Sequence, residues 1–180
     1  MDTLKKNKYK YVKNLISSEL VHFLSSWSLK NFKIKPDYQA PMSFCVHSKE
    51  SEIYTHILHF LKPLIEKETN LNLKPIYSYN RIYLGGSDLK KHIDRDACEI
   101  SVSISLESFY ENKEYKWTLC MKDIPIVIES GDGVIYKGRE IEHWRPTFTQ
   151  PKECWHHQLF LHYVDLNGDF SNIKEELYYE

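Results

Sequence analysis

The sequence predicts an α+β fold in which helices come first and a set of short strands follows. Helical spacing of apolar residues dominates the first third of the chain, and from residue 72 onward the pattern changes to that of strands. Short strands separated by turn residues are typical of sandwiches and barrels, and helices can cover the outside of such a structure.

Length and composition indicate one globular domain. The chain has 180 residues, enough to bury a sizeable core. Its 24 lysines and arginines nearly balance its 25 aspartates and glutamates, so no overall field favours nucleic acid or a membrane surface as a partner. We expect no signal peptide and no membrane span. The four cysteines are scattered, without a C-x-x-C pair, which indicates free thiols and a cytoplasmic location.

Two helices are expected before residue 72. The stretch 17–27 opens with two serines and a glutamate, which can cap a helix. Its apolar residues share one helical face: Leu20, Phe23, Leu24 and Trp27. The stretch 49–70 has Ser51 as a candidate N-cap, and Pro63 is expected to bend or interrupt this helix. Its apolar face is expected to hold Ile53, Ile57, Phe60, Leu61 and Leu64.

At least six strands are expected in the remainder. Their segments are LKPIYSYNRIYLG, CEISVSISLE, YKWTLCMKD, PIVIES, GVIYKG and WHHQLFLHYVD. The stretch 99–106 alternates strictly between apolar residues and the serines Ser101, Ser103 and Ser105. The serine face of this strand either lines a polar cavity or faces solvent, and the strand alone does not decide between the two.

A histidine and an aspartate lie two residues apart just before that alternating strand. In an extended segment, residues i and i+2 project to the same side, so His92 and Asp94 can point at one atom. Two such ligands and a distant histidine form the facial triad that leaves half of the coordination sphere of Fe(II) open. A lone His-x-Asp pair is weak evidence, because composition alone often produces one.

The surroundings of this pair strengthen the hypothesis. The downstream segment ESGDGVIYKGREIEHWRPTF holds two glycine turns around a strand and then His143. The segments RIYLGGSDLKKHIDR, CEISVSISLE, PIVIESGDGVIYKGREIEHWR and HHQLFLHYVD together resemble the Fe(II)- and 2-oxoglutarate-dependent oxygenases. The resemblance is to the prolyl-4-hydroxylase-like branch, and it spans residues 75–165.

The resemblance implies a fold and its boundaries. The core would be a double-stranded β-helix, a jelly-roll or cupin-like structure, with the N-terminal helices packed on the outside of its major sheet. The whole chain, residues 1–180, would be a single oxygenase domain. It would comprise a mainly helical buttress over 1–71, a jelly-roll core over 72–166 and a C-terminal tail over 167–180.

The resemblance also implies a catalytic site. His92, Asp94 and His143 correspond to the iron ligands, with 2-oxoglutarate as co-substrate and O2 as oxidant. Tyr83, nine residues before His92, corresponds to a tyrosine that hydrogen-bonds the co-substrate. The alternative for Tyr83 is an ordinary strand aromatic whose hydroxyl is satisfied elsewhere.

One feature of the family does not match. Its members usually hold the distal carboxylate of 2-oxoglutarate with an arginine or lysine on the strand after the second histidine, where this chain has His156. Arg145, two residues past His143, would share the inward face of an extended segment, and its planar guanidinium suits a carboxylate. Arg145 is therefore the preferred anchor, with Lys152, Arg81 and His156 as alternatives.

The function that follows is a hydroxylase, because Asp94 occupies the position at which halogenating relatives replace the carboxylate. A small-molecule or peptidyl substrate is expected, an amino-acid side chain of prolyl-like kind, and the charge balance argues against nucleic acid. Two alternatives stay open. The first is a cupin-like metalloenzyme that does not use 2-oxoglutarate, and the second is a non-catalytic jelly-roll binding module.

Overall fold

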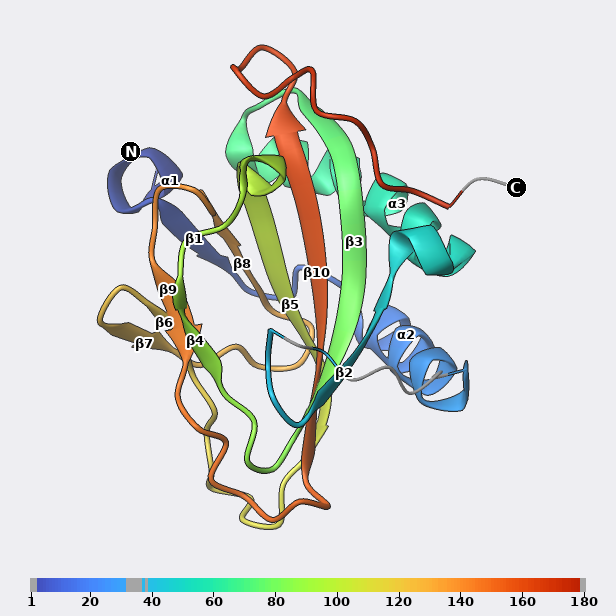
Figure 1. The fold of residues 1–180 in the computed structure, drawn as a ribbon, viewed down its shortest axis with the longest axis vertical. Helices are drawn as coiled ribbons and strands as arrows, with labels where there is room; N and C mark the ends of the chain where they lie inside the picture. The colour runs from blue at the N-terminus through green and yellow to red at the C-terminus, as the bar shows by residue number, and fades with distance from the viewer. Residues whose placement is uncertain (1–2, 32–36, 38, 179–180) are drawn as a thin grey trace.

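The computed structural model describes residues 3–31, 37 and 39–178 (Figure 1). Its helices are α1 (Thr3–Asn7), α2 (Ser18–Asn31) and α3 (Glu52–Thr69), with the short 3-10 helices η1 (Ser48–Glu50) and η2 (Asp96–Cys98). Its strands are β1 (Tyr9–Val12), β2 (Ser43–His47), β3 (Leu73–Leu84), β4 (Leu89–His92), β5 (Ile100–Phe109), β6 (Leu119–Met121), β7 (Ile124–Ile126), β8 (Gly133–Tyr136), β9 (His143–Arg145) and β10 (Trp155–Asp165).

The strands form two antiparallel sheets. The larger sheet has the order β1-β8-β5-β10-β3-β2, and the smaller sheet has the order β4-β9-β6-β7. Figure 1 shows helices α2 and α3 behind the larger sheet, while the smaller sheet lies on its other side. Both faces of the larger sheet are therefore covered, which explains why β3, β5 and β10 are buried along most of their length.

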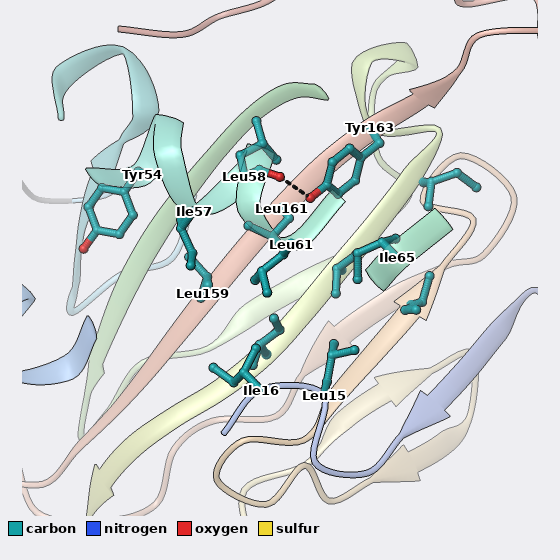
Figure 2. Packing of buried hydrophobic residues seen from close by; sticks show 14 of the residues in the cluster. Leu15, Ile16, Tyr54, Ile57, Leu58, Leu61, Ile65, Leu159, Leu161 and Tyr163 are labelled. Atoms are coloured by element: carbon teal, nitrogen blue, oxygen red, sulfur yellow. Dashed lines mark hydrogen bonds between the residues drawn. The ribbon is translucent and has the colours of Figure 1, made fainter. Parts of the chain in front are cut away.

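The main hydrophobic core lies between the larger sheet and the two long helices (Figure 2). Leu159 and Leu161 of β10 point toward the helices and are fully buried there. The hydroxyl of Tyr163 donates a 2.8 Å hydrogen bond to the backbone carbonyl of Leu58, so α3 is tied to β10 by a polar contact within an apolar layer. This layer fixes the outer face of β10 and thereby turns its alternate residues inward.

The serine face of β5 points inward and is buried. Ser101, Ser103 and Ser105 are between 0% and 3% exposed, so they line the interior between the sheets and do not face solvent. The apolar residues that alternate with them, Ile100 and Val102 among them, belong to the core beneath the helices. The inner side of β5 is consequently polar, whereas β3 and β10 add buried aromatic rings such as Tyr79 and Phe160 to the inner side of the larger sheet.

Several details differ from the sequence-based expectation. Strands β1 and β2 lie before residue 72 and were not predicted; they form the two edges of the larger sheet. Pro63 does not interrupt α3, because it lies on the solvent side, where water can satisfy the carbonyl that loses its N–H partner. Phe23 and Phe60 are 54% and 70% exposed and do not belong to the buried helix faces, whereas the other apolar residues predicted for those faces lie in the core or pack against it.

The expected capping and thiol states agree with the structure in part. Ser17 caps α2 through a 3.3 Å hydrogen bond from the backbone N–H of Leu20 to its hydroxyl. Ser51 is the N-cap residue of α3, but its side chain makes no capping hydrogen bond. All four cysteines are free. Within the described residues, no helix combines the length and the apolar character needed to cross a bilayer.

The helix-facing core gives a direct stability prediction. Leu58→Ala removes a side chain that is fully buried between α3 and the sheet, so we expect the free energy of unfolding to fall by about 2–5 kcal/mol. Phe60→Ala, two residues along the same helix at a 70% exposed position, should change it by less than about 0.5 kcal/mol. Urea denaturation followed by circular dichroism measures both values, and equal effects would contradict this assignment of the core.

Candidate metal centre

The candidate ligands are brought together by the pairing of two short strands. β4 and β9 are antiparallel, with Leu89 opposite Arg145 and His92 opposite His143. Four residues of β4 (89–92) thus span the same register as three of β9 (143–145), which is a bulge. In a regular strand residues 89 and 92 would face opposite sides, but here both Leu89 and His92 line the same cavity.

Three donor atoms converge at this point. The Nε2 atom of His92 lies 3.6 Å from Oδ1 of Asp94, and the Nε2 atom of His143 lies 3.5 Å from the same oxygen. All three ligand atoms lie within 4.8 Å of one another. His143 is buried and the side chain of His92 is 38% exposed, so one side of the group is open.

The hydrogen bonds of the two imidazoles fix which nitrogen faces the centre. Nδ1 of His92 lies 2.8 Å from the carbonyl oxygen of Lys90, and Nδ1 of His143 lies 3.1 Å from that of Ile141. A carbonyl oxygen only accepts, so Nδ1 carries the proton in each ring and Nε2 keeps its lone pair. This is the arrangement in which a protein orients histidine ligands toward a metal.

Charge at the centre favours an ionised carboxylate. Burial opposes ionisation of Asp94, but the neighbouring imidazoles of His143 and His92 outweigh burial and lower the pKa of Asp94 below its ordinary value. Burial likewise opposes protonation of His92, yet hydrogen bonding to Asp94 and to the Lys90 carbonyl leaves the pKa of His92 raised. Protonation of His92 is thus favoured by Asp94, so a proton would compete with a metal for the space between these two groups.

The donor set fits a ferrous ion. It offers two imidazole nitrogens and one carboxylate oxygen with an open side, which is the set found in non-haem Fe(II) oxygenases. The second oxygen of Asp94 is occupied by a 2.8 Å hydrogen bond from the hydroxyl of Ser101. A Cβ atom at Gly138 would lie 2.3 Å from that oxygen, so the carboxylate sits in a space that only glycine leaves free.

A cavity of about 270 Å³ joins the candidate ligands to two buried arginines, Arg81 and Arg145. Arg81 is neutralised by Asp37, with an N–O distance of 2.5 Å. Arg145 donates to the backbone carbonyl of Trp117 at 3.3 Å and to Oε1 of Gln158, and its guanidinium lies 4.6 Å from the centre of the Trp117 ring.

Arg145 is a buried cation without a carboxylate partner in the part of the chain that the structure describes. Its Nε atom is buried and has no hydrogen-bond partner there. Burial lowers the pKa of Arg145. Because an uncompensated buried charge is costly, this site is suited to an anion that enters the cavity.

The other sequence-based candidates for the anchor are less well placed. Lys152 is exposed in the turn before β10 and does not line the cavity. His156 lines a separate cavity of about 240 Å³, and its two ring nitrogens contact Tyr110 at 2.8 Å and Gln158 at 3.1 Å. Burial holds the pKa of His156 well below its ordinary value, so this ring is neutral.

Tyr83 lies beside the cavity and not in its wall. It is fully buried, its hydroxyl oxygen accepts a 3.0 Å hydrogen bond from Arg81, and its ring meets that of Trp117 edge to face. Since Arg81 supplies that donor, the phenolic proton of Tyr83 stays available to an acceptor.

Sequence reasoning did not identify Gln158 or assign a role to Ser101. The signal for Gln158 was its place in the period-two pattern of β10, in which His156, Gln158, Phe160 and His162 share one face. Gln158 receives the hydrogen bond from Arg145 and donates one of 2.6 Å to Ser103, so it links the arginine to the serine face of β5. His162, which is buried, contacts the hydroxyl of Ser101 at 3.0 Å.

Comparisons with known proteins identify the fold. No protein-family model matches the sequence, and no curated protein matches it at a significant level. A solved prolyl-4-hydroxylase from Pseudomonas putida is similar at a TM-score of 0.68 and 14% identity, covering 89% of this chain and 95% of the other. The viral collagen prolyl hydroxylase of Paramecium bursaria Chlorella virus-1, solved with 2-oxoglutarate, gives 0.65 and 12%, covering 88% and 97%.

A third similar structure is HygX from Streptomyces hygroscopicus, with nickel, 2-oxoglutarate and hygromycin B bound. Its TM-score is 0.71 at 10% identity, covering 98% of this chain and 94% of the other. Such identities establish a shared fold and leave the chemistry to be argued from the site. The chain has the fold of the 2-oxoglutarate- and Fe(II)-dependent oxygenases, with two antiparallel sheets and few helices.

Proposed function

We propose that residues 1–180 form a single Fe(II)- and 2-oxoglutarate-dependent dioxygenase domain, and that its two sheets form a double-stranded β-helix. The observation that carries the proposal is one cavity that holds both an open His-Asp-His group and a buried arginine without a carboxylate partner among the described residues. A metal alone would account for the first feature. A metal together with a dianionic co-substrate accounts for both.

The metal would be held by Nε2 of His92, Oδ1 of Asp94 and Nε2 of His143. Each Nε2 keeps its lone pair because the Nδ1–H of the same ring donates a hydrogen bond to a backbone carbonyl. Oδ1 is the oxygen of Asp94 that faces the imidazoles, because Oδ2 accepts a hydrogen bond from Ser101. The open side of the group faces the cavity that Arg145 also lines. Fe(II) is the metal that this donor set favours when positions must stay free for other ligands.

Arg145 would bind the distal carboxylate of 2-oxoglutarate. Its Nε atom is a donor without a partner among the described residues, while Gln158 and the carbonyl of Trp117 hold the other side of the guanidinium in place. Charge-assisted hydrogen bonds between a guanidinium and a carboxylate are about twice as strong as neutral ones. Tyr83 does not line this cavity, and its hydroxyl oxygen accepts a hydrogen bond from Arg81, so it would hold that arginine in place and would not bind the co-substrate directly.

The bound iron and 2-oxoglutarate would supply the oxidation itself: O2 is consumed, the 2-oxo acid becomes succinate and CO2, and one oxygen atom enters a substrate C–H bond. The chain's task is positioning and protection. The two histidines and Asp94 keep one side open, Arg145 sets the orientation of the co-substrate, and buried aromatic rings such as Tyr79 and Phe160 exclude water from the cavity wall.

The substrate we propose is an amino-acid or peptidyl side chain of prolyl-like kind. Two structures of the same fold are prolyl hydroxylases by name. HygX has hygromycin B bound, so the fold itself also accommodates small molecules. A cupin-like metalloenzyme that does not use 2-oxoglutarate, or a non-catalytic binding module, does not explain why the charge of Arg145 is buried beside the candidate ligands.

Metal binding should depend on the three ligands. We expect His92→Ala or His143→Ala to weaken binding of Fe(II) at least a hundredfold in anaerobic titration calorimetry, because each removes one of three protein ligands. His56→Ala, at an exposed position on α3, is the matched control and should bind as the wild type does. Retained affinity in both ligand variants would refute the proposed site.

Affinity for the metal should fall as the pH falls. A histidine must lose its proton to bind a metal, and the pKa of His92 is raised by Asp94 and the Lys90 carbonyl against the opposing effect of burial. Full affinity is therefore expected well above that raised pKa, with a decline beginning at a higher pH than an ordinary histidine near 6.5 would give. Titrations at a series of pH values measure this decline, and an affinity independent of pH would contradict it.

The role of Arg145 is tested with two 2-oxo acids. Arg145→Ala should weaken 2-oxoglutarate binding to the Fe(II) protein by about tenfold to a hundredfold, as expected for losing about 1.5–3 kcal/mol of charged hydrogen bonding. Pyruvate lacks the distal carboxylate, so its weaker binding should be the same in wild type and variant. The visible charge-transfer band of a chelated 2-oxo acid reports both titrations under anaerobic conditions.

The exposed residue Lys152 provides the control for that experiment, and Lys152→Ala should leave both affinities unchanged. If Arg145→Ala binds 2-oxoglutarate as tightly as the wild type does, Arg145 is not the anchor. If the wild type binds Fe(II) but gives no charge-transfer band and no succinate, the metalloenzyme without 2-oxoglutarate becomes the better account.

A further inference from the structure

A hydrogen-bonded chain lies behind Asp94, on the side away from the histidine ligands. The hydroxyl of Ser101 lies 2.8 Å from Oδ2 of Asp94 and 3.0 Å from Nδ1 of His162. Ser101 and His162 are direct partners in the pairing of β5 with β10. Both residues are buried, with exposures of 0% and 3%.

The direction of these hydrogen bonds follows from the number of protons available. Ser101 has one hydroxyl proton and two acceptors, the carbonyl oxygen of Cys98 at 3.3 Å and the carboxylate of Asp94 at 2.8 Å. The ionised carboxylate is the nearer and the stronger acceptor, so this proton goes to Asp94. The serine oxygen then accepts from Nδ1–H of His162. Burial lowers the pKa of His162 to about 4, so the ring is neutral and carries a single N–H proton. This proton lies on Nδ1 and forms the hydrogen bond to the oxygen of Ser101.

The imidazole of His162 is held rigidly in this position. Its ring stacks on Tyr77 with 4.4 Å between ring centres and lies 5.7 Å from Tyr79. The hydroxyl of Tyr77 is in turn fixed by a 3.0 Å contact with Cys98. Stacking on Tyr77 and the hydrogen bond to Ser101 restrict rotation of the ring, so its Nδ1 presents a donor at a fixed point.

The opposite nitrogen of His162 argues against a purely structural role. Its Nε2 atom is buried and has no hydrogen-bond partner among the described residues. A buried polar atom without a partner lowers stability, and native proteins rarely keep one without a reason. Phenylalanine would provide the same stacking without that cost. The useful part of this side chain is therefore Nδ1.

We infer that Ser101 and His162 are positioning residues that hold Asp94 as a one-oxygen ligand, with Oδ1 toward the metal and Oδ2 turned away from it. This inference rests on the proposed function. Gly138 completes the arrangement, because a Cβ atom there would lie 2.3 Å from Oδ2 of Asp94 and 2.8 Å from the serine oxygen. Keeping Asp94 from binding through both oxygens leaves a coordination position free on the open side.

Co(II) alone is a suitable probe, because its visible bands report coordination geometry without turnover. Ser101→Ala should weaken Co(II) binding by roughly tenfold to a hundredfold, the usual effect of losing a hydrogen bond to a metal ligand, and should shift the bands. His162→Phe keeps the ring stack but removes Nδ1, and should act in the same direction by a smaller factor. His162→Asn keeps a donor nitrogen near that position and should bind Co(II) more tightly than His162→Phe.

A double variant shows whether His162 acts through the serine. In a Ser101→Ala background, His162→Phe should cause no further loss of Co(II) affinity, because the chain is already broken. His157→Phe is the matched control: His157 lies on the opposite face of the same strand, is equally buried, and contacts Ser25 and Asn80. It should retain wild-type Co(II) affinity and spectrum, and thermal unfolding of each metal-free variant confirms that it is folded.

The outcomes separate the inference from the proposed function. Wild-type protein that binds no Co(II) would overturn both. Wild-type protein that binds Co(II), with folded Ser101→Ala and His162→Phe variants that bind it equally well and give unchanged bands, would overturn the positioning role alone. So would a His162→Asn variant that binds less tightly than His162→Phe, since packing would then matter and the donor would not.

Discussion

The antiparallel register of β4 and β9 places His92 directly opposite His143, and the geometry of the candidate site depends on this pairing. The bulge in β4 turns His92 inward, and Asp94 follows two residues later, its N–H bonded at 2.8 Å to the carbonyl of Gly138. Shifting the register by one residue would send one imidazole to the opposite face of its strand. The smaller sheet contains few residues, yet it positions both imidazoles, while Asp94 lies just beyond β4 and is hydrogen-bonded to Gly138 and to Ser101 of the larger sheet.

The larger sheet has a complementary role. Its outer face is held by the apolar contacts of α2 and α3, so its inner face is free to carry polar side chains without loss of the core. Ser101, Ser103 and Gln158 use that freedom: the first holds Asp94, and the other two form a chain to Arg145. One face of these strands thus contributes to the hydrophobic core, and the opposite face carries polar residues of the candidate site. This separation explains how the protein keeps a buried cation and a partly buried carboxylate a short distance from a well-packed core.

The sequence predicted the long elements well, because their patterns are strong. The alternation over residues 99–106 predicted β5, and the segment 155–165, rich in β-branched, aromatic and other apolar residues, predicted β10. Short strands such as β1 and β2 were missed, since four or five residues with partial burial carry little periodicity. Phe23 and Phe60 were wrongly predicted to lie on the buried faces of α2 and α3, since both are exposed. Hydrophobic spacing indicates a helix, whereas contacts with the sheet decide which face is buried.

The candidate ligands could be predicted from the sequence, but the residues that hold them in place could not. The His-x-Asp spacing and the distant His143 could be recognised from the chain, and the structure brings them within 4.8 Å. Whether they bind iron stays a prediction. The links from Ser101 to His162 and from Arg145 to Gln158 depend on the register of β5 with β10 and on the course of the loop after β9, which no local pattern specifies.

The central claim is that two histidines and one aspartate, and no sulfur, surround the metal. Cys98 makes this a sharp test, because it forms a second possible group with Asp94 and His162 close by. X-ray absorption at the iron edge of the anaerobic Fe(II) protein measures the donor atoms directly. The account predicts a first shell of nitrogen and oxygen with the scattering pattern of two imidazoles. A sulfur neighbour, or fewer than two imidazoles, would contradict it.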